Sequence, residues 1–346
     1  AICQNISFFK KIDLFGRKLM FEEHNEQSYN TYLGSVFTIL TFLAVSIMAF
    51  LFGQEIYQRN IPIVTTSDEI ITQSNVILSK FPVLFSFHKF NGESIDNVYK
   101  YLDFNVTYVY TDDNLNFKSQ IFQSLEACNP DNYKNHQEYV RNYLDSNHNF
   151  YCASHIPNFK IKNSAASSNS YTLFLEVKKC NQTLRNQNKL KSSDDINNHK
   201  PDNIDCDQGG KDPFDIVSGV SIRYMNSFAD PKNYSEPIKY YEETLLLFFS
   251  KSIRKSAIIS LANNLLTSDN GWILEEVKQT EFIVVRNVKE ETTFVKEDDE
   301  GAFVFFDSPV IRQKTTRNYM KVQELFAKIG GLFSAFNIIC HVLLYD

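Results

Sequence analysis

The sequence predicts a membrane protein of the α+β class, in which two transmembrane helices flank a β-rich, sandwich-like extracytosolic domain. Three observations lead to this fold class. The first is an uncharged apolar run near the amino terminus, Tyr32 to Phe52, and the second is another apolar run at the opposite end, Leu325 to Tyr345. The third is the stretch between them, where apolar and polar residues alternate in many short segments, as they do in half-buried strands.

Residues 1–31 are predicted to form a cytosolic juxtamembrane arm. Bases precede the apolar run in excess, while Glu55 and Arg59 cancel after it, so the positive-inside rule places the amino terminus in the cytosol. The arm mixes these bases with apolar residues, which favours a helix along the headgroup surface or a segment packed against a partner. The charged residues of the arm that decide the bias are Lys10, Lys11, Arg17 and Lys18, against Glu22 and Glu23.

Residues 32–53 are predicted to form the first transmembrane helix. About twenty uncharged residues suffice to cross a hydrocarbon core of ~30 Å at ~1.5 Å per residue. A buried core helix of a soluble protein is usually shorter and interrupted by polar residues. We therefore expect this helix to act as an uncleaved signal anchor.

Residues 54–321 read as one large lumenal or extracellular domain made mostly of strands. Within it, residues 181–215 are almost wholly polar and are predicted to form a long solvated loop; a calcium site among its carboxylates is the alternative. The stretch from Leu115 to Leu144 is expected to hold one or two helices. The strand candidates are Ile77–Phe87, Leu102–Tyr110, Tyr171–Val177, Val217–Tyr224, Thr244–Phe249, Ala257–Leu261, Trp272–Val277, Phe282–Val288 and Ala302–Phe306.

Four cysteines lie in this domain at wide spacings: Cys128, Cys152, Cys180 and Cys206. No CxxC pair is present in the sequence, which disfavours a structural zinc site or a thioredoxin-type motif. In an oxidising compartment four cysteines predict two disulfides, for which three pairings are possible. Pairing between sequence neighbours is slightly favoured, because each bond would then close one polar excursion.

Three sequons for N-glycosylation occur in the same domain, at Asn105, Asn181 and Asn233. Each consists of Asn-x-Ser or Asn-x-Thr, and a chance sequon at Asn5 shows that the Asn-rich composition also produces such triplets. All three lie in the domain that the positive-inside rule places outside the cytosol. Together they predict a glycoprotein.

Residues 322–346 are predicted to form the second transmembrane helix. Lys328 lies one turn from its outer end and can reach the headgroups. Small and polar residues then recur at helical spacing, which predicts close contact with another helix, either the first one or one of another subunit. The residues of this expected helix-packing face are Gly330, Gly331, Ser334, Asn337 and His341.

The sequence offers no chemistry for catalysis. A formal net charge of −6 and a pI near 5.7 disfavour a nucleic-acid surface. The seven histidines are scattered singly, and no GxSxG, HExxH or glycine-rich phosphate loop occurs in the sequence. We therefore expect no enzyme, no catalytic residue, no cofactor, no metal, no nucleic-acid partner and no small-molecule substrate.

Motifs at both ends resemble known membrane proteins. IDLFGRKLMF, TYLGSVFTI and Pro62 surround the first apolar run, while TSDNGWILEE (267–276) and RNYMKVQELFAKIGGLF (317–333) precede and enter the second. Together they resemble two-pass transmembrane proteins that are abundant in ciliates. FFDSPV and IGGLFSAFNI are distantly similar to ERGIC-type cargo receptors of the early secretory pathway. That resemblance implies two membrane helices, cytosolic ends and a lumenal domain rich in β-sandwich structure.

These features favour a non-enzymatic integral membrane glycoprotein that acts as a structural or accessory subunit of a larger membrane assembly. Its expected partners are membrane lipid and other transmembrane subunits. Its expected location is the secretory pathway or the cell-surface or ciliary membrane. The alternatives are a cargo or sorting receptor of the ERGIC type and a subunit of a mitochondrial inner-membrane complex. A trimeric two-helix channel would be expected to have more cysteines in its outer domain.

Overall fold

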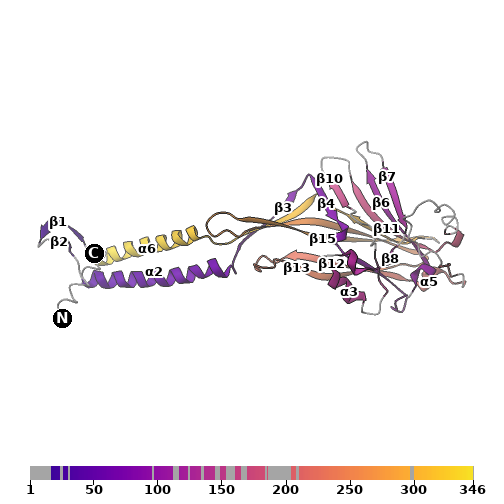
Figure 1. Ribbon diagram of the computed structural model, residues 1–346, viewed down its shortest axis with the longest axis horizontal. Coiled ribbons are helices and arrows are strands. Elements are labelled where there is room, and N and C mark those ends of the chain that lie inside the picture. Colours follow the sequence, from indigo (N-terminus) through magenta and orange to yellow (C-terminus); the bar gives the residue numbers. More distant parts are fainter. Residues whose placement is uncertain are drawn as a thin grey trace.

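The computed structural model shows an elongated molecule with a pair of helices at one end and a β domain at the other (Figure 1). The start of α2 and the end of α6 lie at the far end of the helix pair. The residues that the structure describes are 17–23, 26–29, 32–95, 97–111, 117–123, 125–133, 136–144, 149–152, 160–164, 170–183, 185, 204–207, 210–296 and 300–345.

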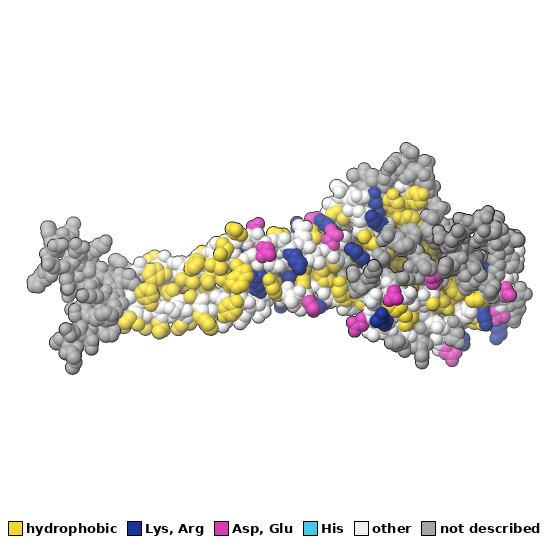
Figure 2. All heavy atoms as spheres, in the orientation of Figure 1, with side chains coloured by type: hydrophobic (Ala, Val, Ile, Leu, Met, Phe, Trp, Pro, Cys, Tyr) yellow, Lys and Arg dark blue, Asp and Glu magenta, His cyan; other side chains and the backbone are white. Residues whose placement is uncertain are grey.

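Two long helices form the pair, α2 (Tyr32–Gln58) and α6 (Val322–Tyr345), and they lie side by side. By length and composition, α2 is the one helix among the described residues that is apolar enough to cross a membrane. Hydrophobic side chains cover much of the pair, and charged ones gather toward the β domain (Figure 2). The remaining helices are α3 (Gln137–Leu144) and α5 (Pro213–Ile216), with 3₁₀ turns at Leu78–Lys80, Val98–Lys100 and Pro130–Asn132.

The face of α2 that is buried is made of small and hydroxyl residues. It consists of Gly34, Ser35, Thr38 and Thr41, with Ile56 near the other end. The hydroxyls of Thr38 and Thr41 donate to backbone carbonyls one turn back, at 2.9 and 2.8 Å, so they need no outside partner. Thr41 Oγ1 lies 3.9 Å from Cys340 Sγ of α6, and this face therefore packs against α6.

The β domain contains a ten-stranded and a five-stranded sheet. The ten-stranded sheet is built from β3 (Ile63–Ile70), β4 (Gln73–Ile77), β6 (Leu102–Thr111), β7 (Phe117–Gln123), β10 (Lys160–Ser164), β11 (Tyr171–Lys179), β14 (Ile253–Asp269), β15 (Val277–Phe294), β16 (Glu300–Asp307) and β17 (Ile311–Asn318). The five-stranded sheet follows the order β13-β12-β5-β9-β8, with β5 (Val83–His88), β8 (Glu126–Ala127), β9 (Tyr151–Cys152), β12 (Gly219–Ala229) and β13 (Ile238–Phe248). The expectation of a β-rich domain is thus confirmed.

One core is shared by the two sheets. Leu173 and Leu175 of β11 contribute to it from the larger sheet, and Val220 and Ile222 of β12 from the smaller one. These residues are spaced two apart, so each strand turns one side to the core. A second, smaller cluster forms around Leu84, where Val140 of α3 packs with Phe150 and the disulfide cysteines Cys128 and Cys152.

The amino-terminal arm contains a hairpin of β1 (Arg17–Glu23) and β2 (Glu26–Tyr29). A surface helix was the expected alternative, and over residues 17–23 that prediction is wrong. The two strands pair with each other across a two-residue connection, so their backbone groups find partners without a helix. The rest of the arm lies outside the described residues.

A long hairpin of β14 and β15 connects the β domain to the helix pair (Figure 1). Its strands have 17 and 18 residues, which corresponds to about 56 Å at ~3.3 Å per residue. Along its other edge β14 pairs in parallel first with β16 and then with β17. Arg286 interrupts the β14–β15 register between the pairs Ser260↔Asn287 and Leu261↔Val285, which is a bulge.

The strand expected over Trp272–Val277 is wrong for all but its last residue. Residues 270–276 form the turn of the long hairpin instead. The carboxylate of Asp269 accepts the backbone N–H of Gly271 at 3.1 Å and of Glu276 at 2.9 Å, which closes the turn. A Cβ atom on Gly271 would lie 1.7 Å from the Leu274 carbonyl oxygen, so only glycine fits there.

Candidate functional site

Five side chains from separate elements meet where the β domain joins the helix pair: Arg59, Tyr234, Trp272, Arg317 and Tyr319. We call this group the junction. Arg59 follows the last residue of α2, Tyr234 lies in the β12–β13 turn and Trp272 in the β14–β15 turn. Arg317 belongs to the end of β17, and Tyr319 stands between β17 and α6. The junction therefore contacts both chain segments that connect the domain to the helices.

Arg59 is buried among three aromatic rings and is 6% exposed. Its guanidinium carbon lies 4.9 Å from the ring centre of Tyr234, 5.2 Å from that of Trp272 and 5.7 Å from that of Tyr319. Nη1 also donates to the Tyr234 hydroxyl at 2.8 Å. The backbone at Arg59 is left-handed, with φ 51°, and it ends the helix. This conformation is unfavourable for any residue with a side chain, so it costs free energy. Contacts with the rings, each worth ~0.5–2 kcal/mol, offset that cost.

Arg317 fixes the turn that carries Tyr234, and it is 3% exposed. Its Nε donates to Ser268 Oγ at 2.6 Å. Its two Nη atoms donate to three backbone carbonyls of the β12–β13 turn, those of Pro231 at 3.3 Å, Asn233 at 2.6 Å and Tyr234 at 3.1 Å. The guanidinium holds its N–H donors in one rigid plane and can therefore bond to all three carbonyls at once. The ammonium of a lysine could not match this arrangement.

Neither guanidinium of the junction has a carboxylate partner within the part of the chain that the structure describes. The neighbouring carboxylate, Asp269, instead forms an ion pair with Lys321 Nζ at 2.8 Å. Burial of Asp269 acts to raise its pKa, but the bond from Lys321 and the two backbone N–H groups outweigh burial, so the pKa is lowered. The bond to Asp269 raises the pKa of Lys321. This pair connects the end of β14 to the residue before α6.

The first turn of α6 is also bonded to the hairpin turn. Val322 N donates to the Trp272 carbonyl at 2.9 Å, and the Gln323 amide donates to the Ile273 carbonyl. The hairpin thus satisfies one of the unpaired backbone N–H groups at the start of the helix, that of Val322, and also binds the Gln323 side chain. The junction contains no nucleophile beside a base, and the described residues include no cluster of three metal-ligating side chains. Its bonds and ring contacts join the hairpin turn to the chain segments next to both long helices.

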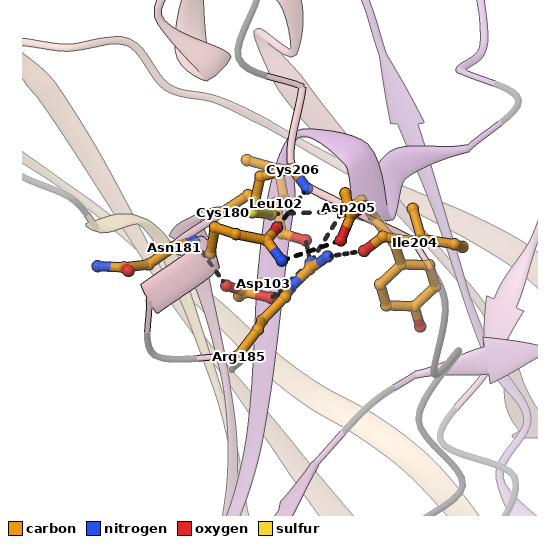
Figure 3. Close-up of a disulfide and its surroundings, with 10 residues drawn as sticks. Leu102, Asp103, Cys180, Asn181, Arg185, Ile204, Asp205 and Cys206 are labelled. Atoms are coloured by element: carbon orange, nitrogen blue, oxygen red, sulfur yellow. Dashed lines mark hydrogen bonds and ion pairs between the residues drawn. A yellow bond between two sulfur atoms is a disulfide. The ribbon is translucent and has the colours of Figure 1, made fainter. Parts of the chain in front are cut away.

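Both disulfides join sequence neighbours, Cys128 with Cys152 and Cys180 with Cys206. Beside the second, Arg185 anchors the start of the polar loop to β6 (Figure 3). Arg185 forms an ion pair with Asp103 at 2.6 Å and donates to the Ile204 carbonyl at 2.8 Å. The loop's two ends are thereby held together. Most of its middle lies outside the described residues.

The three sequon asparagines lie in different surroundings. Asn105 is in β6, paired on both sides, and its amide donates to Glu176 at 3.1 Å. Asn233 is half-buried in the β12–β13 turn, where its side-chain oxygen accepts from Glu236 N. Asn181 is exposed just after β11. The structure therefore offers Asn181 as the most accessible of the three acceptors.

The expected helix-packing residues of α6 do not pack against α2. Gly330, Gly331, Ser334 and Asn337 are all exposed, and a Cβ atom on either glycine would meet nothing within 4 Å. The side chain of His341 lies outside the described ones. Instead, α6 turns Cys340 and Phe333 to α2, with Phe333 6.5 Å from the Phe42 ring.

Sequence reasoning did not identify the junction. From the sequence, Arg59 is a charge that Glu55 cancels and Trp272 is the start of an expected strand, while Arg317 and Tyr319 are named only within the motif RNYMKVQELFAKIGGLF. One signal was present in the sequence. The chain has a single tryptophan, and it follows the turn-forming pair Asn270-Gly271.

Residues 84–307 match the family model described as "Uncharacterised 80 kDa protein N-terminal domain". The chain belongs to this family. The matched residues include all four disulfide cysteines and two junction residues, Tyr234 and Trp272. They exclude both long helices and the junction arginines Arg59 and Arg317.

Two solved structures are similar to the chain at low identity. One is the cryo-EM structure of a proton-activated chloride channel, with a TM-score of 0.30 and 10% identity, covering 90% of this chain and 100% of that one. The other is the crystal structure of Erv41p, with a TM-score of 0.27 and 9% identity, covering 73% of this chain and 99% of that one. Neither likeness is close enough to bear on function. No curated protein matches the chain.

Proposed function

We propose that this chain is a non-enzymatic subunit of a larger membrane assembly. In this proposal α2, which is apolar enough to cross a membrane, crosses it with the less apolar α6 packed against it, the amino terminus is cytosolic and the β domain lies outside as a glycoprotein domain. The observation that carries the proposal is the exposed face of α6 formed by Gly330, Ser334 and Asn337, which we call the free face.

The free face suits another helix better than it suits lipid. Residues 330, 334 and 337 are spaced by four and three, so they share one side of the helix. Small residues allow two helix backbones to approach closely, and a side-chain amide in hydrocarbon needs a hydrogen-bond partner. Since α2 packs on a different side of α6 and is the only other long helix among the described residues, the proposal places the partner helix in another chain.

Two further features support a position outside the cytosol. The disulfides Cys128–Cys152 and Cys180–Cys206 are bonds that persist in oxidising compartments. The sequon at Asn181 is exposed on the same domain. The junction fits the role of a subunit, because it couples the outer domain to both helices.

A photo-crosslinking residue at position 334, in the full chain expressed in its own membrane, tests the proposal. The matched control is position 339, where Ile339 is 53% exposed and lies on the opposite side of α6. We expect a protein adduct of defined mass from position 334 and none from 339. The mass tells whether the partner is a second copy or a different protein. Lipid adducts alone from both positions would refute the proposal.

A further inference from the structure

The tip of the long hairpin presents three consecutive apolar side chains to the surroundings. Trp272, Ile273 and Leu274 are 52%, 59% and 79% exposed. Such a run at the end of a turn is unusual, because turns that face water are normally built from polar residues. A surface that covers these three side chains is therefore to be expected.

The structure fixes the height of this tip relative to α6. Val322 N donates to the Trp272 carbonyl, so the tip lies level with the first residue of the helix. The apolar run of α6 begins at Leu325, three residues further on, which is about 5 Å along the axis. A bilayer with headgroups exceeds its hydrocarbon core by ~5–7 Å on each side. If α6 spans, the tip lies within the headgroup layer.

The tip is held rigidly in this position. Asp269 closes the turn through the N–H groups of Gly271 and Glu276, and the missing side chain at Gly271 allows the chain to fold tightly. The Trp272 ring is fixed against the guanidinium of Arg59. The exposed apolar side chains of Ile273 and Leu274 therefore remain on the outside of a preformed loop.

Other exposed apolar residues occur in the neighbouring chain segments. Tyr57, in the last turn of α2, is 58% exposed, Ile61 just after it is 71% exposed, and Phe326 of α6 is 68% exposed. Lys328 lies two residues further along α6, with its ammonium 5.5 Å from the centre of the Phe52 ring. Aromatic residues with nearby bases are typical of the membrane–water interface.

We propose that the hairpin tip inserts into the outer leaflet, so that lipid covers Trp272, Ile273 and Leu274. The inference rests on the proposed membrane-spanning arrangement of α2 and α6. Lipid is the occupant because the tip lies at the level of the headgroups and the apolar surface continues onto both helices. An indole favours this depth, since its ring is apolar and its N–H can bond to headgroups or water.

The single tryptophan makes the inference directly testable, because all indole emission reports on position 272. The full chain is reconstituted in phosphatidylcholine vesicles, either unlabelled or brominated at shallow or deep acyl positions. We expect loss of emission with the shallow-brominated lipid and less loss with the deep one. The paired variant Ile273→Ser with Leu274→Ser weakens this loss, while co-flotation with the vesicles persists through α2 and α6.

The outcomes separate the two proposals. Co-flotation without quenching overturns the insertion of the tip and leaves the membrane-spanning helices intact. A blue-shifted, unquenched emission would show that protein covers the tip, and a red-shifted one that water does. Failure to co-float overturns the proposed membrane protein and the inserted tip together. The variant Trp272→Phe gives the background emission of the tyrosines.

Discussion

Arg59 shows how one residue can terminate a helix and bind the β domain to it. A left-handed backbone normally favours glycine, yet the side chain here contacts three aromatic rings from three different segments. The guanidinium is planar and weakly hydrated, so it stacks on rings when buried, whereas an ammonium would lose more hydration. The contacts of the Arg59 side chain across the junction thus offset the small free-energy cost of its left-handed backbone.

We predict that Arg59→Ala lowers the free energy of unfolding by about 2 kcal/mol, because ring contacts and the bond to Tyr234 are lost from a buried position. Thermal unfolding of the purified full chain in detergent measures this. Arg286→Ala is the matched control, since Arg286 forms an exposed pair with Asp68 at 3.3 Å. That control should change stability by less than about 1 kcal/mol. Equal effects of the two changes would contradict the role of the junction.

At the scale of elements, the β14–β15 hairpin and α6 depend on each other. The turn supplies carbonyls for the first residues of α6, and Asp269 at the end of β14 pairs with Lys321. A lowered carboxyl pKa means that the folded state favours the charged form. This contribution to stability is therefore present above the unfolded pKa of ~3.9 and is lost as the pH falls through the folded pKa.

Accordingly, we predict that the hairpin turn loosens on acidification below about pH 3.9, where Asp269 takes up its proton. Emission of Trp272 in detergent reports this, because the indole is held against Arg59 in the intact turn. Asp269→Asn should remove the transition from this pH window. Asp68→Asn, at an exposed acid of another strand, should leave it in place. A transition that persists in Asp269→Asn would exclude this carboxylate as its source.

The elements that sequence alone predicts are those with a local signal. The apolar run from Tyr32 gave α2, and alternation gave β6 and β11, because burial on one face sets a period of two. The prediction of a strand over Trp272–Glu276 is wrong, because this apolar segment forms a turn that is determined by Asp269 and Gly271. The sequence did not predict which face of α2 packs against α6. That face contains Thr38 and Thr41, whose hydroxyls bond to their own helix and so give no sign of a neighbouring helix. The junction has no local period, as five elements assemble it.

At the scale of the whole molecule, the disulfides, the sequons and the helix pair support the proposed arrangement across a membrane. The disulfides and Asn181 lie in the β domain, and α2 begins and α6 ends at the other end of the molecule (Figure 1). In the proposed topology the domain is exposed to the glycosylation machinery. The three acceptors should then differ in use, because Asn181 is exposed, whereas Asn105 and Asn233 are half-buried.

We predict that Asn181 carries a glycan and that Asn105 does not. The Asn105 amide is bonded to Glu176 within a doubly paired strand, whereas Asn181 is exposed after β11. Mobility on denaturing gels, before and after glycosidase treatment, measures occupancy. Asn181→Gln should remove most of the glycosidase-sensitive shift and Asn105→Gln none of it. A chain with unchanged mobility and reduced cysteines would place the domain in a reducing compartment and reverse the topology.

The length of the β14–β15 hairpin also sets the distance between the β domain and the helix pair. One end is embedded in the core, where β16 pairs with β14, and the other end meets α6. Removing one residue from each strand would turn the side chains beyond the deletion to the opposite face of the hairpin, so only even changes keep both ends in their present orientation. The height of the β domain above the helices can therefore change only in steps of two residues, about 6.6 Å each. Any partner that touches both the domain and the helix pair must fit one of these discrete heights.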